Sequence, residues 1–166
     1  MSGVSYELSA LAGSREVAAR AAGLAGAAQV ELSQGYGLVL ITPEVLDRLG
    51  GGGGNAFGTT FWYLSAGIEA LARRVSHTGP IAYLEAEMFG GVGTQATVVW
   101  LNGEVWLGPA TTQFGWPPPD RATSPHWAFN QALRQLGVTR GAAFDEFDAV
   151  GLGRHRHTGD WLAHHA

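Results

Sequence analysis

The region from residue 81 to residue 108 constrains the fold of this chain more than any other part of the sequence. Asn102-Gly103 is the strongest short signal for a hairpin turn, and Gly90-Gly91-Val92-Gly93 forms a second connection upstream. The two connections separate three segments rich in β-forming side chains: residues 81–89, 94–101 and 104–108. The region therefore predicts a three-stranded antiparallel meander.

The remaining patterns alternate between strand and helix. Three further strands are predicted, at residues 4–11, 29–33 and 37–41. Apolar residues at helical spacing, with Ser14 and Thr42 as N-caps, predict helices at residues 15–25, 43–49 and 124–136, and one that begins at residue 64 and ends near Gly79-Pro80. This order predicts an α+β fold, in which an antiparallel sheet of about five or six strands has helices packed on one face.

We expect residues 1–166 to form a single domain, because this length is close to the usual size of one. Five consecutive glycines at residues 50–54 predict a surface loop. A phosphate-binding loop is not predicted there, because Asn55-Ala56-Phe57 follows in place of Gly-Lys-Ser or Gly-Lys-Thr. Residues 141–166 are expected to form a loop-rich C-terminal tail.

Composition excludes several classes of function. Cysteine is absent, which excludes disulfides, thiolate zinc sites and cysteine nucleophiles. The net charge of −4, with 14% charged residues, provides no basic surface for nucleic acid, so no nucleic-acid partner is expected. No apolar run reaches the roughly 18 residues of a membrane span, and residues 1–10 lack the pattern of a signal peptide. We therefore expect a cytoplasmic protein without membrane contact.

The segment 81–89 holds the first candidate site. Tyr83, Glu85 and Glu87 share one strand face, and the opposite face carries small and apolar residues. If the apolar face is the core face, two carboxylates about 7 Å apart project from the other one. Such a pair could perform acid/base chemistry, bind a divalent cation or hold an arginine. The alternative is a solvated face or an internal ion pair with Arg154 or Arg156.

Two neighbouring segments could extend that site. Glycines at positions 90, 91 and 93, followed by Gln95, would let backbone N–H groups converge on an anion, although such a segment is more often a wide hairpin or bulge. In an extended segment His155 and His157 would face one way, as two ligands beside Glu85 or Glu87. Exposed, unused histidines are the alternative. The sequence has no zinc-enzyme, Rossmann or nucleophile-elbow motif, so no metal or cofactor is predicted. The candidate binding residues here are Tyr83, Gly90, Gly91, Gly93, Gln95, Arg154 and Arg156.

The chain also contains six tryptophans and four tyrosines, more than one core of this size needs. Aromatic residues are favoured at protein interfaces, so Trp100 and Trp106 are candidates for a contact surface. The alternative is that the aromatic residues fill a core otherwise built from alanine and glycine.

Three segments carry a resemblance to other proteins: residues 83–95, residues 130–138 and residues 145–161. In these segments the chain resembles a group of small uncharacterised actinobacterial proteins, and the similarity spans nearly the whole sequence. That group has no established activity, so the resemblance implies no role for any residue. In its small size, acidity and lack of cysteine the chain is also similar to bacterial immunity proteins, which neutralise a toxin by binding it.

These patterns favour a non-catalytic protein-binding module, in its most concrete form an immunity-type inhibitor of a partner toxin. Its charge would come from Glu85, Glu87, Asp145, Glu146 and Asp148. The alternative is a small enzyme that acts on an anionic small molecule. Its catalytic residues would be Glu85, Glu87, His155 and His157, with an arginine as the clamp. The sequence leaves the oligomeric state open.

Overall fold

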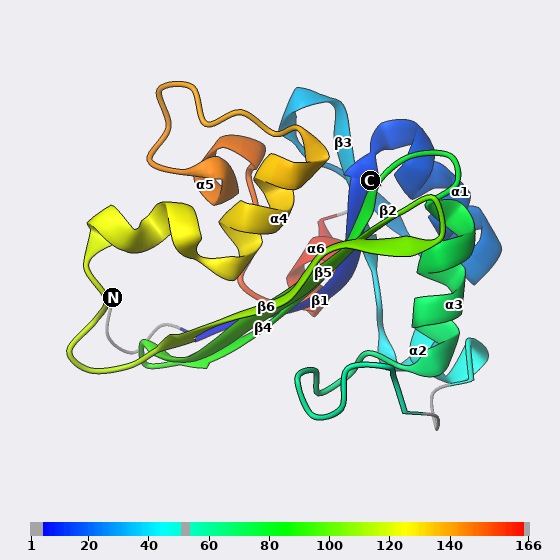
Figure 1. The fold of residues 1–166 in the computed structure, drawn as a ribbon, viewed down its shortest axis with the longest axis horizontal. Coiled ribbons are helices and arrows are strands. Elements are labelled where there is room, and N and C mark those ends of the chain that lie inside the picture. Colours follow the sequence, from blue (N-terminus) through cyan, green and yellow to red (C-terminus); the bar gives the residue numbers. More distant parts are fainter. Residues whose placement is uncertain (1–4, 51–53, 165–166) are drawn as a thin grey trace.

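A computed structural model describes residues 5–50 and 54–164, whose strands form one antiparallel sheet in the order β2-β3-β1-β4-β5-β6 (Figure 1). The strands are β1 (Ser5–Ser14), β2 (Gln29–Glu31), β3 (Tyr36–Leu40), β4 (Ile81–Phe89), β5 (Val92–Leu101) and β6 (Glu104–Phe114). The helices are α1 (Arg15–Ala25), α2 (Pro43–Arg48), α3 (Ala66–Val75), α4 (Ala128–Leu136), α5 (Glu146–Val150) and α6 (Thr158–Ala163). The predicted α+β class and the order of elements along the chain are confirmed.

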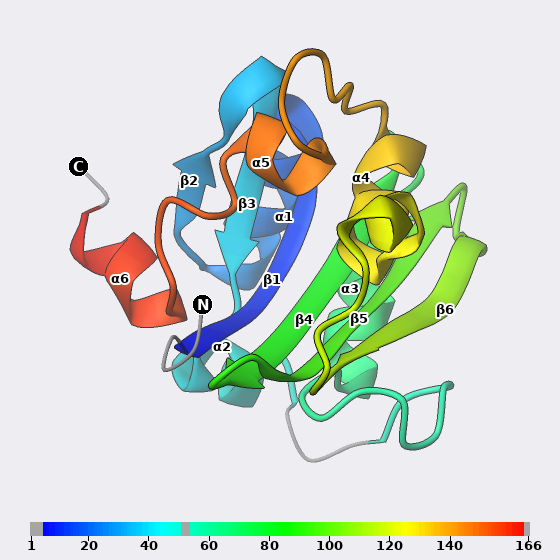
Figure 2. The same cartoon turned by 90° about the vertical axis from the view of Figure 1, so that its left-hand side faces the viewer.

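The helices cover both faces of the sheet, so the prediction that they pack on one face is wrong. α1 and α3 lie on one face and α4 and α5 on the other, while α6 lies beside the beginning of β1 (Figures 1 and 2). The reason lies in β4, which is apolar on both sides in its first half. Ile81 and Tyr83 point to α3, while Ala82 and Leu84 point to α4. A strand that is covered by helices on both faces typically lies in the centre of a sheet.

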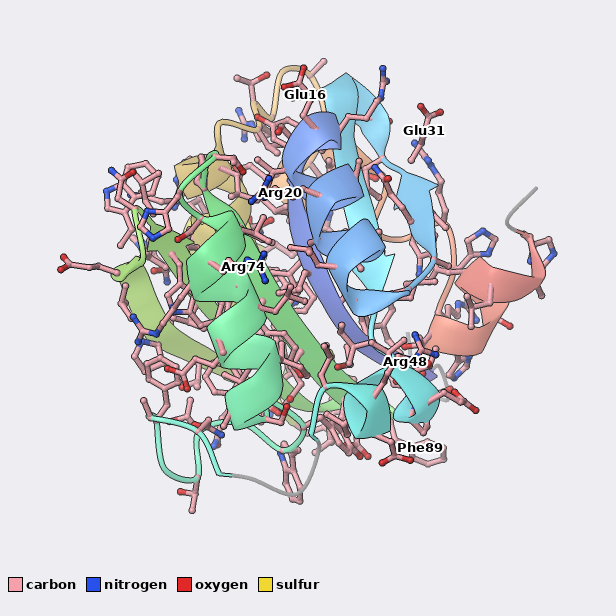
Figure 3. The ribbon with its side chains drawn as sticks, turned by 90° about the vertical axis from the view of Figure 1, so that its right-hand side faces the viewer. Glu16, Arg20, Glu31, Arg48, Arg74 and Phe89 are labelled. Carbon is pink, nitrogen blue, oxygen red and sulfur yellow. The ribbon has the colours of Figure 1, made fainter. Side chains whose placement is uncertain are left out.

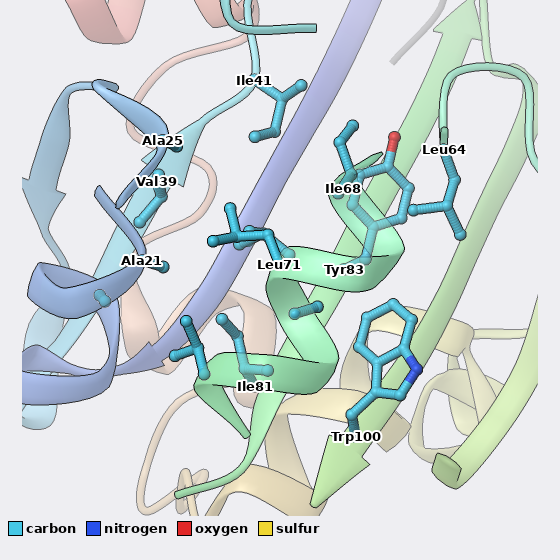
Figure 4. Packing of buried hydrophobic residues seen from close by; sticks show 14 of the residues in the cluster. Ala21, Ala25, Val39, Ile41, Leu64, Ile68, Leu71, Ile81, Tyr83 and Trp100 are labelled. Atoms are coloured by element: carbon cyan, nitrogen blue, oxygen red, sulfur yellow. The ribbon is translucent and has the colours of Figure 1, made fainter. Parts of the chain in front are cut away.

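Two hydrophobic clusters result, one on each face. The first surrounds Trp100 and Tyr83, with Ile68 and Leu71 of α3 packed against them (Figure 4). The second is centred on Phe129 of α4. Each fully buried large apolar side chain contributes about 1.5–3 kcal/mol to the free energy of unfolding, because folding removes its apolar surface from water. The sheet is therefore held between two cores.

Several boundaries differ from the prediction. β6 extends to Phe114 instead of residue 108, and α4 begins at Ala128, after a 3-10 turn at Arg121–His126. The tail 141–166 contains two short helices, α5 and α6, and residues 165–166 lie outside the described residues. Gly51 to Gly53 of the predicted glycine loop also lie outside them.

Two helical glycines provide a stability test. A Cβ at Gly67 would collide with the carbonyl oxygen of Leu49, where the beginning of α3 meets the end of α2, whereas a Cβ at Gly23 would meet nothing within 4 Å. We expect Gly67→Ala to lower the free energy of unfolding by about 1–3 kcal/mol through overpacking. Gly23→Ala should raise it by about 0.5–1 kcal/mol through helix propensity. Urea denaturation measures both, and stabilisation by both substitutions would contradict this packing of α2 against α3.

Candidate functional site

The Glu85 carboxylate is buried and fully engaged in hydrogen bonds. Its side chain is 3% exposed, Oε2 accepts from the backbone N–H of Trp62 at 2.7 Å, and Oε1 accepts from that of Tyr63 at 2.9 Å. The Tyr83 hydroxyl donates to the same Oε1 at 2.9 Å. Because a phenol has one proton, Ser9 Oγ donates to Tyr83 Oη across their 2.9 Å contact. This network attaches the segment that precedes α3 to the sheet.

The expectation that Glu85 and Glu87 project from a non-core face is wrong. They do share a face, but it is the face of the first hydrophobic cluster, because the sheet is covered on both sides. Glu85 lies under residues 61–64, and Glu87 is exposed with Oε2 3.5 Å from the Tyr63 hydroxyl. Within the described residues neither acid forms an ion pair with arginine or histidine. Glu85 is satisfied by backbone N–H groups and not by the arginine that the sequence suggested as an ion-pair partner.

A third acid joins this end of the sheet. Glu7 of β1 lies directly opposite Glu87 of β4 in the strand register. Its Oε1 accepts from Thr158 N at 2.8 Å, and its Oε2 accepts from Thr158 Oγ1 at 3.2 Å. The negative charge of Glu87 raises the pKa of Tyr63, and burial and the charges of Glu85 and Glu7 raise it further. This end of the sheet therefore has a negative electrostatic potential.

The predicted glycine segment is a tight hairpin. β4 and β5 remain paired up to Phe89 and Val92, and Gly90 and Gly91 form a two-residue turn with φ of 61° and 82°. Both values are in the left-handed region that primed hairpin turns require. Gly93 lies within β5, where a Cβ would collide with the Glu87 carbonyl oxygen. The segment thus has the hairpin geometry given above as the alternative to an anion loop.

Gln95 has a structural contact. It is buried on the opposite face of β5 from Thr94, and its Oε1 accepts from the backbone N–H of Phe129 at 3.0 Å. Thr112 Oγ1 accepts from Ala128 N at 2.8 Å. Because α4 has no side-chain cap of its own, these two strand residues satisfy N–H groups of its first turn.

The segment 154–157 approaches the acids but directs its side chains elsewhere. The Arg156 carbonyl accepts from Glu7 N at 2.7 Å, which places the chain beside β1. His157 Nε2 lies 2.8 Å from Ser5 Oγ, and its Nδ1 lies 3.2 Å from Asp160 Oδ2. Neither Glu85 nor Glu87 is among its hydrogen-bond partners.

Arg154 and His155 line a separate cavity of about 690 Å³ between α1, β2 and α6. Arg154 donates to Ser33 Oγ at 2.6 Å, and His155 packs against the rings of Trp161 and His164. The structure therefore separates these two residues from the Glu85 network. In residues 5–50 and 54–164 no three histidine or acidic side chains are grouped closely enough to hold a metal ion.

The acids expected near residue 145 are mostly internal. Asp145 accepts from Asn130 Nδ2 at 3.0 Å and from Asp148 N at 2.8 Å. Buried Glu146 pairs with Arg134 at 3.3 Å. Asp148 is exposed on α5, on the opposite face of the sheet from Glu87.

The two candidate tryptophans differ in burial. Trp100 is 0% exposed and belongs to the first cluster, as expected if the aromatic residues fill the core. Trp106 on β6 is 46% exposed. Trp62, which belongs to the excess of aromatic residues noted in the sequence, is 74% exposed, and Phe89, which is 78% exposed, was missed. Figure 3 shows Phe89 outside the ribbon, at the rim of the face that carries α1 and α3. The sequence signal for an exposed aromatic surface was the pair Trp62-Tyr63, because these two large aromatic residues belong to no helical or strand periodicity.

Several exposed residues lie next to Glu87. Phe89 and Val92 are cross-strand partners, Glu87 lies two residues earlier on the same face, and Tyr63 contacts Glu87. Trp116 lies beyond the turn and donates from Nε1 to the Gly90 carbonyl at 3.3 Å. We define the hairpin-end surface as Trp62, Tyr63, Glu87, Phe89 and Val92.

Comparison with protein families, with curated proteins and with solved structures found no match to this chain. Within the described residues no helix combines the length and the hydropathy that a membrane crossing requires. The interpretation of the site therefore rests on its geometry.

Glu85 and Glu87 form a matched pair for a test of the network. Glu85→Gln replaces one carboxylate oxygen with an NH₂ group that faces a backbone donor, so the free energy of unfolding should fall by about 2–4 kcal/mol. Glu87→Gln changes an exposed acid and should alter it by no more than about 0.5 kcal/mol. Urea denaturation at neutral pH measures both values. Equal effects of the two substitutions would refute the assigned role of Glu85.

Tyr83 predicts a dependence of stability on alkaline pH. Burial, and next the charge of Glu85, raises the pKa of Tyr83 well above its usual value. Its stabilising contribution is complete below the unfolded pKa of about 10 and is lost as the pH rises towards the raised pKa of the folded state. The free energy of unfolding should therefore fall above about pH 10, by up to about 1.4 kcal/mol per pH unit for this group.

Tyr83→Phe separates this effect from the loss of the hydrogen bond. The lost bond lowers stability at every pH, whereas the missing ionisation makes the slope above pH 10 shallower. Urea denaturation over a series of alkaline pH values measures the slope. An unchanged slope in the variant would contradict the shifted pKa.

Proposed function

We propose that this chain is a non-catalytic protein-binding module whose contact region is the hairpin-end surface. The observation that supports this most strongly is the exposure of Phe89 and Trp62. Phe89 lies two residues after Glu87 on the same strand face, and Trp62 directly precedes Tyr63, whose hydroxyl contacts Glu87. Aromatic side chains dominate the binding energy of protein interfaces when a partner buries them. Grouped around a polar centre, they form a larger apolar surface than single exposed residues do.

Charge indicates the chemistry of the partner. Glu87 forms no salt bridge with another described residue, and Glu7 lies opposite it in the register. The whole chain has a net charge of −4. A partner with lysine or arginine at its contact region would gain from this potential, both in association rate and in specificity.

The finer form of this proposal is an immunity-type inhibitor that covers a basic region of a toxin. The small acidic chain and the exposed acid among aromatic residues support it. The enzyme alternative needs a histidine within hydrogen-bond reach of Glu85 or Glu87. Among the described residues, the hydrogen-bond partners of these two carboxylates are backbone N–H groups and tyrosine hydroxyls, which favours binding over catalysis.

Differential capture tests the proposal. Wild-type protein and the variant Glu87→Arg plus Phe89→Ala are used as bait in extracts of the source cells. The matched control is Trp106→Ala, which removes an exposed aromatic residue of β6. A specific partner should be retained by the wild type and the control and reduced at least about tenfold by the double variant, since loss of a central aromatic residue costs about 2 kcal/mol or more.

The affinity of the purified partner should also fall with increasing salt, because the attraction is electrostatic. If all three baits retain the same proteins in equal amounts, the hairpin-end surface is not the contact region. If the double variant unfolds, its thermal melting curve reveals this before the capture is interpreted, and Phe89→Ser alone replaces it.

A further inference from the structure

A second cavity, of about 600 Å³, lies where β1, the beginning of α2 and α6 meet. Its walls are mainly apolar, with Ile41 and Leu46 contributed by α2 and the residues just before it, and Leu162 by α6. Ser9, which donates to Tyr83 in the Glu85 network, also lines it. A cavity of this size and lining is typical of a site for a small organic molecule.

The ionisable groups that line this cavity are acidic or phenolic. They are Glu7, Glu44 and Tyr63, and none of the described arginines or histidines belongs to the lining. Among the described residues, the Glu7 carboxylate hydrogen-bonds to Thr158 alone, with one bond to each oxygen. Each of these oxygens can accept a further hydrogen bond. The negative charges of Glu87, Glu85 and Glu7 also act on Tyr63 and raise its pKa.

This combination selects among ligand classes. An anion would be repelled by the two carboxylates, and a small metal ion prefers several oxygen ligands over apolar walls. An organic cation suits both features, because its ammonium group can donate to Glu7 while its apolar part contacts Ile41 and Leu46. Hydrogen bonds between charged groups are roughly twice as strong as neutral ones.

We propose that this cavity binds a small organic ammonium ion with an apolar body, held by the Glu7 carboxylate. The proposal does not rest on the proposed protein contact, since of the residues that define the hairpin-end surface only Tyr63 also lines the cavity. Either proposal can therefore fail without the other.

Calorimetric titration with 2-phenylethylammonium tests the site. The matched probes are 2-phenylethanol, which has the same apolar body without charge, and 3-phenylpropionate, which has the opposite charge. The ammonium ion should bind at least about tenfold more tightly than the alcohol, because a charge-assisted bond replaces a neutral one, and the carboxylate should not bind. Absence of ammonium binding, or equal binding of the three probes, overturns the proposal.

Two substitutions locate the binding. Glu7→Gln should weaken ammonium binding at least about tenfold, and Glu104→Gln, an exposed acid at the beginning of β6, should leave it unchanged. Because Glu7 also binds Thr158, a second variant, Leu162→Trp, reduces the cavity volume while Glu7 is kept. It should also weaken binding at least tenfold. Wild-type affinity in either folded variant, or an equal loss with Glu104→Gln, overturns the assignment to this cavity.

Discussion

The buried Glu85 carboxylate is the interaction on which the arrangement around the candidate site depends. A carboxylate removed from water is costly unless its oxygens are satisfied, and here two backbone N–H groups and the Tyr83 hydroxyl satisfy them. Both N–H groups belong to the segment before α3, which has no strand pairing of its own. The acid therefore fixes an irregular segment to the central strand of the sheet.

The side chains of that segment have two different environments. Phe61 and Leu64 enter the first hydrophobic cluster, whereas Trp62 and Tyr63 remain exposed. One anchor thus helps to close a core and also holds two exposed aromatic residues, of which Tyr63 contacts Glu87. Tyr63 additionally borders the apolar cavity beside β1, so the proposed protein surface and the proposed ammonium site both depend on the position of this segment.

Local patterns were sufficient to predict much of the fold. Ser14 and Thr42 accept from Val17 N and Val45 N, as expected of N-caps, and the order of strands and helices follows the predicted one. The orientation of β4 was not predictable from alternation, because the partners of Glu85 are backbone groups, which leave no trace in residue type. The position of α6 depends on the contact between Glu7 and Thr158, which are 151 residues apart in sequence. Contacts of that kind decided which faces of the sheet are covered and where the candidate residues lie.

Amide hydrogen exchange at Trp62 and Tyr63 tests the central claim most directly. A backbone N–H that donates to a buried carboxylate opens only when the network opens, so both amides should exchange as slowly as those of paired strands β4 and β5, and much faster in Glu85→Gln. The amide of Gly58, which donates no hydrogen bond to another described residue, provides the internal reference for rapid exchange. Exchange of Trp62 and Tyr63 at the rate of Gly58 in the wild-type protein would contradict the account.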